Sequence, residues 1–118
     1  MGLSMEIKGS ALVALPDCEI DHHSTERLRA QIDAAFDKSS CRHIIMDFSQ
    51  VGFMDSSGIG MIIGRYKSTE KRGGQLCITG MNSEMQRLFN LSGLAKIITR
   101  TDTVDDALKN LQTERELA

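Results

Sequence analysis

Apolar residues follow two alternating patterns along the chain: short runs bounded by turn residues, and stripes with helical spacing. Short runs are typical of strands, and apolar residues three and four positions apart are typical of amphipathic helices. The runs predict five strands, at Met5–Lys8, Ala11–Leu15, His43–Phe48, Gln75–Thr79 and Lys96–Arg100. Gly9-Ser10 lies between the first two and predicts a hairpin.

Four helical stripes occupy the stretches after the hairpin and after each later strand. The first helix is expected from about His22, with Asp21 or Ser24 as its cap, and the third is expected to begin with a capping box of Ser83 and Gln86. In chain order, the apolar faces are Leu28, Ile32, Ala35 and Phe36; Ile59, Ile62, Ile63 and Tyr66; Met85, Leu88 and Phe89; and Val104, Ala107, Leu108 and Leu111.

The predicted element order is ββαβαβαβα, which indicates an α/β fold. Strands that alternate with helices form right-handed crossovers and a mainly parallel sheet. The hairpin adds an antiparallel edge, so the sheet is expected to be mixed, with the helices largely on one face. A chain of 118 residues suits one domain. We expect a core over about residues 5–111 and flexible termini.

Composition and charge exclude several classes of function. The 14 basic and 16 acidic residues give a net charge of −2, so there is no basic excess for direct nucleic-acid binding. No apolar run approaches the length of a membrane span. The three cysteines, Cys18, Cys41 and Cys77, are an odd number without CxxC spacing, which favours a reducing cytoplasm over a disulfide scaffold.

The segment Asp55-Ser56-Ser57-Gly58 is the most informative part of the sequence, because it joins a buried strand to a helix. Ligands and reactive groups of α/β sheets gather at the carboxyl ends of the strands. Ser56 falls near the first helical turn, where backbone N–H groups and the helix dipole favour an anion such as an esterified phosphate. The simpler interpretation is that Asp55 and Ser56 only cap the helix.

Enzyme interpretations of this segment are weaker. A nucleophilic serine needs a base, for which His22, His23 and His43 are the only histidines, and the GxSxG elbow is absent. Gly58 and Gly60 begin a dinucleotide fingerprint, but its third glycine is replaced by Ile63, and no P-loop follows. No cofactor is therefore expected.

The glycines of the second helix are better explained by its helical wheel. Gly60 and Gly64 fall together on a side away from the predicted apolar stripe. Because glycine weakens a helix by about 1 kcal/mol relative to alanine, two outward glycines suggest close approach by a partner's backbone. The alternative is that another element of the same domain packs there.

Two other clusters favour structural roles. Asp21-His22-His23 with Cys18 does not complete a metal site, and a turn leading into a helix is the preferred interpretation. The basic residues Arg65, Lys67, Lys71 and Arg72 are interpreted as a solvated helix face.

Three segments together resemble a known family. Phe53–Gly60 followed by Gly64–Lys67, Glu19–His23 ahead of the first helix, and Arg87–Leu94 in the third are similar to the anti-sigma factor antagonists of the STAS fold, specifically those acting on the sporulation sigma factor F. The resemblance runs from about Met5 to Leu111. Cys18 departs from the family pattern, which usually has glycine there.

The resemblance implies a mechanism and a set of site residues. The unphosphorylated protein would bind an anti-sigma factor that is also a serine kinase and so release the sigma factor; phosphorylation of Ser56 would abolish binding, and a phosphatase would restore it. The protein would be a monomer and not an enzyme. The alternatives are an antagonist for a stress or motility sigma factor, or a small nucleotide-binding or phosphotransfer enzyme using Asp55, Ser56 and His22. Partner contacts are expected at Asp21, His22, Asp55, Ser56, Ser57, Gly58, Gly60, Met61 and Gly64.

Overall fold

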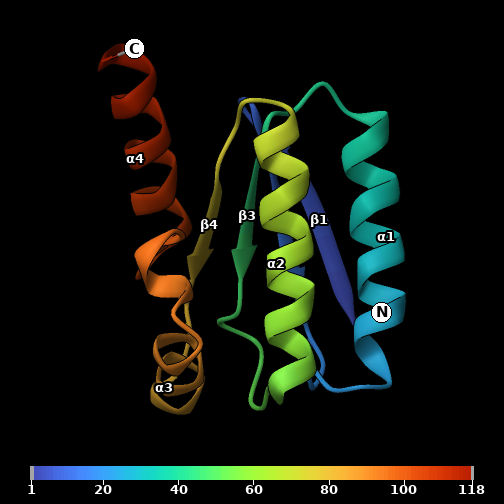
Figure 1. The fold of residues 1–118 in the computed structure, drawn as a ribbon. Coiled ribbons are helices and arrows are strands. Elements are labelled where there is room, and N and C mark those ends of the chain that lie inside the picture. Colours follow the sequence, from blue (N-terminus) through green and yellow to red (C-terminus); the bar gives the residue numbers. More distant parts are fainter. Residues whose placement is uncertain (1, 118) are drawn as a thin grey trace.

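The computed structural model describes residues 2–117, which form one α/β domain of five strands, four α-helices and one 3-10 helix (Figure 1). The elements are β1 (Leu3–Lys8), β2 (Ala11–Pro16), α1 (Ser24–Lys38), β3 (His43–Asp47), α2 (Ser56–Lys71), β4 (Leu76–Thr79), α3 (Ser83–Leu91), η1 (Leu94–Lys96), β5 (Thr99–Thr101) and α4 (Val104–Leu117). The predicted element order is confirmed. Met1 and Ala118 lie outside the described residues, and the expectation of flexible termini falls partly on them.

The strands lie in the sheet in their chain order, β1-β2-β3-β4-β5. β1 and β2 form the predicted antiparallel hairpin, in register from Leu3 opposite Pro16 to Lys8 opposite Ala11. The other three pairs are parallel, each crossing over through a helical segment. Consequently β2, β3 and β4 end at the same edge of the sheet.

The helices cover the two faces of the sheet unequally. α1, α2 and α3 pack on the face that carries Leu12, Ile44, Met46 and Ile78. α4 lies on the opposite face, where Ala107 and Leu111 pack against strand residues that include Val13 and Ile45. The expectation of helices largely on one face is confirmed, with α4 as the exception (Figure 1). Within residues 2–117, no helix combines the length and apolar character needed to cross a membrane.

Two local predictions were wrong near the end of the chain. The predicted strand Lys96–Arg100 is shorter and later, at Thr99–Thr101, because Gly93 adopts a left-handed φ of 83° and the chain turns as a 3-10 helix. The Leu94 carbonyl accepts from the N–H groups of Ile97 and Ile98, which keeps this turn out of the sheet. At the start of α3 the cap is Asn82, whose side chain accepts from the Met85 N–H at 2.9 Å, and not Ser83.

The buried face of α2 is rotated from the predicted stripe. Its buried residues are Gly58, Met61, Ile62, Arg65 and Thr69, whereas Ile59, Ile63 and Tyr66 are only partly buried beside the core. The predicted apolar face was rotated about the helix axis relative to the buried face, because the prediction assumed that Arg65 was solvent-exposed.

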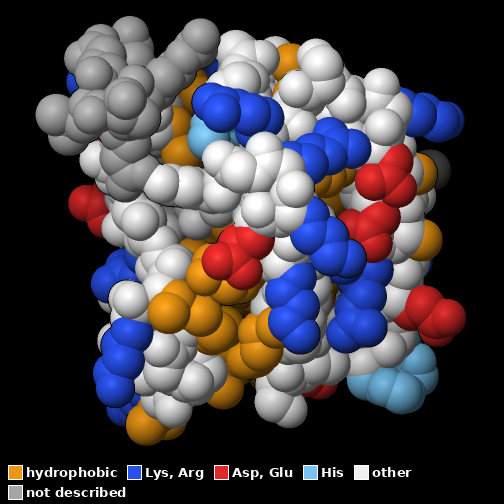
Figure 2. Space-filling model, turned by 45° about the horizontal axis from the view of Figure 1, so that its top comes forward, with side chains coloured by type: hydrophobic (Ala, Val, Ile, Leu, Met, Phe, Trp, Pro, Cys, Tyr) orange, Lys and Arg blue, Asp and Glu red, His pale blue; other side chains and the backbone are white. Residues whose placement is uncertain are grey.

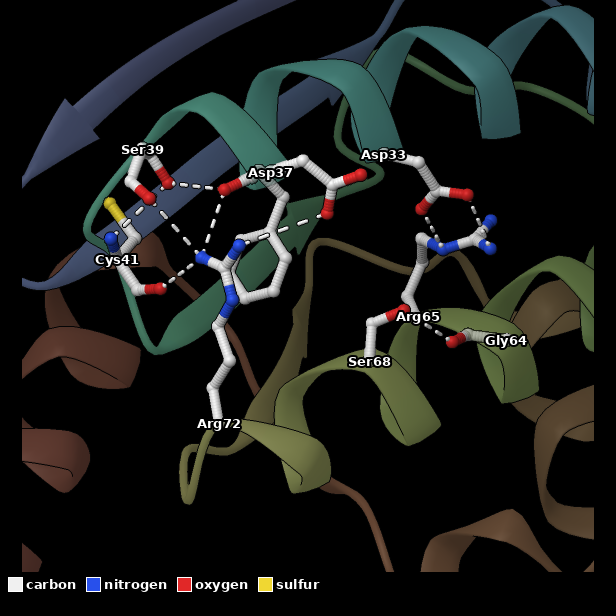
Figure 3. Close-up of polar contacts among 9 residues, drawn as sticks. Asp33, Asp37, Ser39, Cys41, Gly64, Arg65, Ser68 and Arg72 are labelled. Atoms are coloured by element: carbon white, nitrogen blue, oxygen red, sulfur yellow. Dashed lines mark hydrogen bonds and ion pairs between the residues drawn. The ribbon is translucent and has the colours of Figure 1, made fainter.

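The basic residues of α2 are not a uniformly solvated face, because Arg65 and Arg72 connect α2 to α1 (Figure 3). Arg65 is only 6% exposed. Its Nε lies 3.0 Å from Asp33 Oδ1, and its Nη2 donates to Asp33 Oδ2 at 3.1 Å. Burial lowers the pKa of Arg65, whereas the charge of Asp33 raises it.

Arg72 closes the carboxyl end of α1. Its Nη1 donates to the carbonyl oxygens of Phe36 at 2.9 Å, Ser39 at 3.3 Å and Cys41 at 2.8 Å. Its guanidinium carbon lies 4.1 Å from the centroid of the Phe36 ring. Arg72 thus supplies a donor to the carbonyls of Ser39 and Cys41, in the turn after α1, and a further donor to the Phe36 carbonyl, which also accepts from Ser39.

Replacing Arg72 with glutamine is predicted to destabilise the domain by about 1–3 kcal/mol, because carbonyls in a partly buried turn lose their donor. Urea unfolding monitored by circular dichroism measures the change. Arg42→Gln is the matched control, since Arg42 is exposed and its side chain makes no hydrogen bond or ion pair within the described part of the chain. Equal losses in the two variants would contradict the role assigned to Arg72.

Candidate functional site

The site is built where the segments after β2 and β3 meet. The Ile20 N–H donates to the Phe53 carbonyl at 2.9 Å, and the Asp55 N–H donates to the Ile20 carbonyl at 3.0 Å. These bonds form a parallel bridge between Ile20 and Met54. Directly after this bridge both Asp21 and His22 come close to Asp55: the charge of Asp21 raises the pKa of Asp55, and the His22 backbone N–H lowers it. Two segments far apart in the sequence therefore form one surface.

Asp55 is the cap of α2. Its Oδ1 accepts from the Ser57 backbone N–H at 2.8 Å and from the Ser57 hydroxyl. These two bonds hold the pKa of Asp55 below its ordinary value, and the His22 backbone N–H lowers it further. Asp55 is therefore an ionised carboxylate held at the helix N-terminus, as a capping aspartate should be. The interpretation that Ser56 is also a cap is not supported.

Ser56 and Ser57 are adjacent but have different surroundings. Ser57 is partly buried and its hydroxyl is engaged by Asp55. Ser56 is the first residue of α2 and is exposed, and its hydroxyl makes no hydrogen bond among residues 2–111, the part of the chain whose side chains are described. The Ser56 hydroxyl is therefore more accessible than the Ser57 hydroxyl, and it can react without breaking a hydrogen bond to another described residue.

Asp21 organises the other half of the surface. Its Oδ1 accepts from the N–H groups of His23 at 2.9 Å and Ser24 at 3.0 Å. The bond from the Ser24 N–H is the main reason that the pKa of Asp21 lies below its ordinary value. Both His22 and His23 are exposed, with ring centroids 5.0 Å apart in an edge-to-face arrangement. Asp21 thus shapes the turn into α1, as the sequence predicted.

Cys18 precedes this turn at the position where glycine is usual. None of the described non-glycine residues has a positive φ, so the backbone at Cys18 does not need the freedom of glycine. The departure from the family pattern leaves the turn intact.

The glycines of α2 serve two purposes. A Cβ at Gly58 would lie 2.4 Å from Met54 Cγ, so glycine allows the first turn to pack against the bridge segment. At Gly64 a Cβ would meet nothing within 4 Å, and at Gly60 it would meet only the end of the Arg29 side chain, at 3.3 Å. The predicted open side at Gly60 and Gly64 is therefore present in the folded domain.

Two of the expected contact residues, Gly58 and Met61, are buried. Met61 lies on the buried face of α2 and is fully buried, so its side chain cannot contact a partner while the domain keeps this conformation. It supports the site from the core instead. Conversely, Phe53, just before the loop, is 47% exposed and was not among the expected contacts, although an apolar residue ahead of a polar loop is a visible signal.

Arg29 is a second residue that the sequence analysis did not single out. It is exposed on α1, four residues before Asp33, and its guanidinium reaches the Gly60 side of α2. The four-residue spacing of Arg29 and Asp33 places both on one side of α1 and is visible in the sequence, whereas the closeness of that side to Gly60 of α2 is not.

Comparison with known proteins agrees with this architecture. Residues 3–107 match the STAS domain. The chain belongs to the STAS-domain family. It is 36% identical over 110 residues to an anti-sigma F factor antagonist of Paenibacillus polymyxa, covering 93% of this chain and 94% of that protein. It is 32% identical over 80 residues to an anti-sigma-B factor antagonist of Bacillus subtilis, covering 68% and 72%.

Solved structures show the same STAS fold. The anti-sigma factor antagonist SpoIIAA in its unphosphorylated form superposes with a TM-score of 0.81 at 28% identity, covering 94% of this chain and 96% of that one. SpoIIAA in its phosphorylated form gives a TM-score of 0.71 at 29% identity, covering 92% and 97%. A family of regulatory proteins thus shares both the fold and the sequence of this STAS domain.

Among the described residues, no group of three or more His, Cys, Asp and Glu side chains is arranged to hold a metal ion. The Ser56 hydroxyl has no histidine bonded to it among residues 2–111, whose side chains the structure describes.

The capping role of Asp55 predicts a specific pH dependence. Since the folded pKa lies below the unfolded value, ionised Asp55 stabilises the domain above about pH 4, and this contribution is lost as the pH falls through the folded pKa. Carbon-detected NMR titration should place the pKa of Asp55 below 3.8, and Ser57→Ala should raise it.

Asp55→Asn is the matched variant, because asparagine also caps but does not ionise. Its unfolding free energy should depend less on pH below about pH 4 than that of the parent protein. An unchanged slope would show that the Asp55 carboxylate is not differentially stabilised in the folded state.

Proposed function

We propose that this STAS protein is an anti-sigma factor antagonist switched by phosphorylation of Ser56. The unphosphorylated form binds an anti-sigma factor that is also a serine kinase, and binding releases the sigma factor. The kinase transfers the γ-phosphoryl group of ATP to Ser56 Oγ; ADP leaves and the hydroxyl proton is released. The phosphorylated protein then loses affinity, and a separate phosphatase hydrolyses the ester.

The observation that carries this proposal is the contrast between the two serines of the loop. Ser56 is exposed and its hydroxyl makes no bond within the described residues, whereas Ser57 donates to the capping Asp55. The relatives named as anti-sigma F factor antagonists, and the related structure of SpoIIAA in its phosphorylated form, support phosphorylation of a protein with this fold.

Charge explains how one phosphate would act as a switch. A phosphoserine carries about −1.5 to −2 charges at neutral pH. At position 56 it would stand beside Asp55 and next to the Asp21 turn, so a surface with two carboxylates gains a further concentrated negative charge. The first turn of α2 offers free N–H groups that accommodate the phosphate within the fold. Docking is weakened while the domain stays folded.

The sporulation sigma factor F is the favoured target. The relatives named for that factor include one aligned over 93% of this chain, whereas those named for sigma B align over 68%. An antagonist for a stress sigma factor is the second candidate. Mixing the protein with each purified anti-sigma factor in its sigma complex, and measuring which sigma is released, separates the two.

The proposal places the protein in the cytoplasm, as a monomer that binds partners and has no catalytic activity of its own. Incubation of the purified protein with ATP alone tests this: no labelling of the protein and no ADP should be detected. Self-labelling or turnover would instead favour the small phosphotransfer enzyme.

With its kinase and ATP, the protein is predicted to gain one phosphate, on Ser56, as shown by intact mass and peptide mapping. Ser56→Ala should remain unlabelled, bind the kinase, and keep the thermal stability of the parent, because Asp55 and not Ser56 is the cap. Ser56→Asp should bind more weakly, although one carboxylate only partly imitates a phosphate.

Ser57→Ala is the control for position. It should still be phosphorylated on Ser56, with some loss of stability from the Asp55 contact. A phosphate mapped to Ser57 or to a histidine, or Ser56→Asp binding as tightly as the parent, would overturn the assignment.

The open side of α2 generates a separate prediction about docking. Gly64→Leu should leave the isolated domain folded, because a Cβ there meets nothing within 4 Å, yet weaken kinase binding by holding the partner's backbone away. Gly64→Ala should raise stability by up to about 1 kcal/mol. Thermal unfolding and calorimetric binding measure the two effects; unchanged binding of Gly64→Leu would remove this side from the interface.

A further inference from the structure

Arg29 is an exposed cation on the side of α1 that faces α2, and its Nη2 is 3.3 Å from the position that a Cβ at Gly60 would occupy. Among residues 2–111, whose side chains the structure describes, the Arg29 side chain makes no hydrogen bond or ion pair. An unpaired guanidinium held against a helix in this way is available to an anion.

The charged residues next to Arg29 do not neutralise its positive charge. Asp33, one turn further along α1, has both carboxylate oxygens at Arg65, at 3.0 and 3.1 Å (Figure 3). The charge of Arg29 in turn lowers the pKa of Arg65, so the two guanidinium groups repel each other. The Asp33 carboxylate is therefore occupied by Arg65 and not by Arg29. Figure 2 shows Lys and Arg side chains gathered over this helical face.

The spacing of Ser56 and Gly60 on α2 brings the Arg29 guanidinium toward the Ser56 side of the first turn. Ser56 and Gly60 are four residues apart on α2, so they lie on one side, with side-chain positions about 5–6 Å apart. In an α-helix each Cα–Cβ bond tilts toward the N-terminus, so the space next to a Cβ at Gly60 lies over the first turn. The absence of a side chain at Gly60 leaves this space to the Arg29 guanidinium.

We infer that Arg29 is the internal counter-ion of a phosphate on Ser56. This inference rests on the proposed function, because it needs a phosphoryl group at that position. The phosphoserine dianion accepts from the Arg29 guanidinium across the Gly60 gap, a charge-assisted pair of the kind that arginine forms with phosphates. Phosphorylation then changes the docking surface twice: it adds negative charge and it withdraws Arg29 from any partner.

Other charged groups also face the phosphate. Asp55, which precedes Ser56, and Asp21, across the bridge, oppose its second ionisation, whereas a protonated His22 would favour it. Arg29 is the group whose side chain comes from the opposite helix, so its effect can be separated by substitution without altering the loop.

The test uses the full chain with phosphoserine incorporated at position 56 during translation, so that it does not depend on a kinase. Phosphorus NMR titration gives the second pKa of the phosphate. Arg29→Gln should raise this pKa by about 0.5, as expected for loss of one nearby cation in water, and Arg29→Lys should restore part of the difference. Arg87→Gln, which removes an exposed arginine of α3, is the matched control and should leave the pKa unchanged.

Thermal unfolding of the same variants checks that each is folded and gives a second readout. Phosphoserine at position 56 should lower the melting temperature more in Arg29→Gln than in the parent or in Arg87→Gln. The same phosphate pKa in the parent and Arg29→Gln, or equal effects of Arg29→Gln and Arg87→Gln, would overturn the inference. Either result leaves the proposed function to be judged separately by kinase labelling of Ser56.

Discussion

The parallel bridge between Ile20 and Met54 is the interaction on which the site depends. Its two backbone bonds extend the pairing of β2 and β3 beyond the ends of those strands. Without it, the Asp21 turn and the Asp55 cap would belong to two independent loops. With it, the cap of α2, the turn into α1 and the exposed Ser56 hydroxyl form one surface, and Gly58 lets the helix begin directly against the bridge.

The two helices behind this surface, α1 and α2, are joined by arginine contacts in addition to their apolar packing. Arg65 pairs with Asp33 in the groove, and Arg72 satisfies the carbonyls at the end of α1. This arrangement occupies the Asp33 carboxylate, so that Arg29, beside Gly60, has no ion pair among residues 2–111. A stabilising contact between α1 and α2 thereby sets the charge that a phosphate would meet, which connects the packing of the domain to its regulation.

The sequence predicted the element order and the hairpin edge, because hydrophobic periodicity and the parallel crossover rule determine these features. Asp21 and Asp55 were expected only as partner contacts, from the family resemblance, and their meeting was not predicted. The prediction failed where tertiary contacts override local patterns. The stripe of α2 was misplaced since Arg65 is buried through Asp33, a partner 32 residues away. The last strand was misplaced because Leu94 accepts two N–H groups. The role of Arg29 is invisible without the distance between the two helices.

We propose that phosphorylation of Ser56 changes the charge of the surface formed by the Asp21 turn and the Asp55 cap, and leaves the fold of that loop intact. Amide hydrogen exchange measured by NMR on the unphosphorylated and Ser56-phosphorylated protein tests it most directly. We expect the N–H groups of Ile20 and Asp55, which form the bridge, to be equally protected from exchange in both forms, while the affinity for the kinase falls on phosphorylation. Loss of protection at these two amides on phosphorylation would contradict it, because the switch would then act by opening the loop.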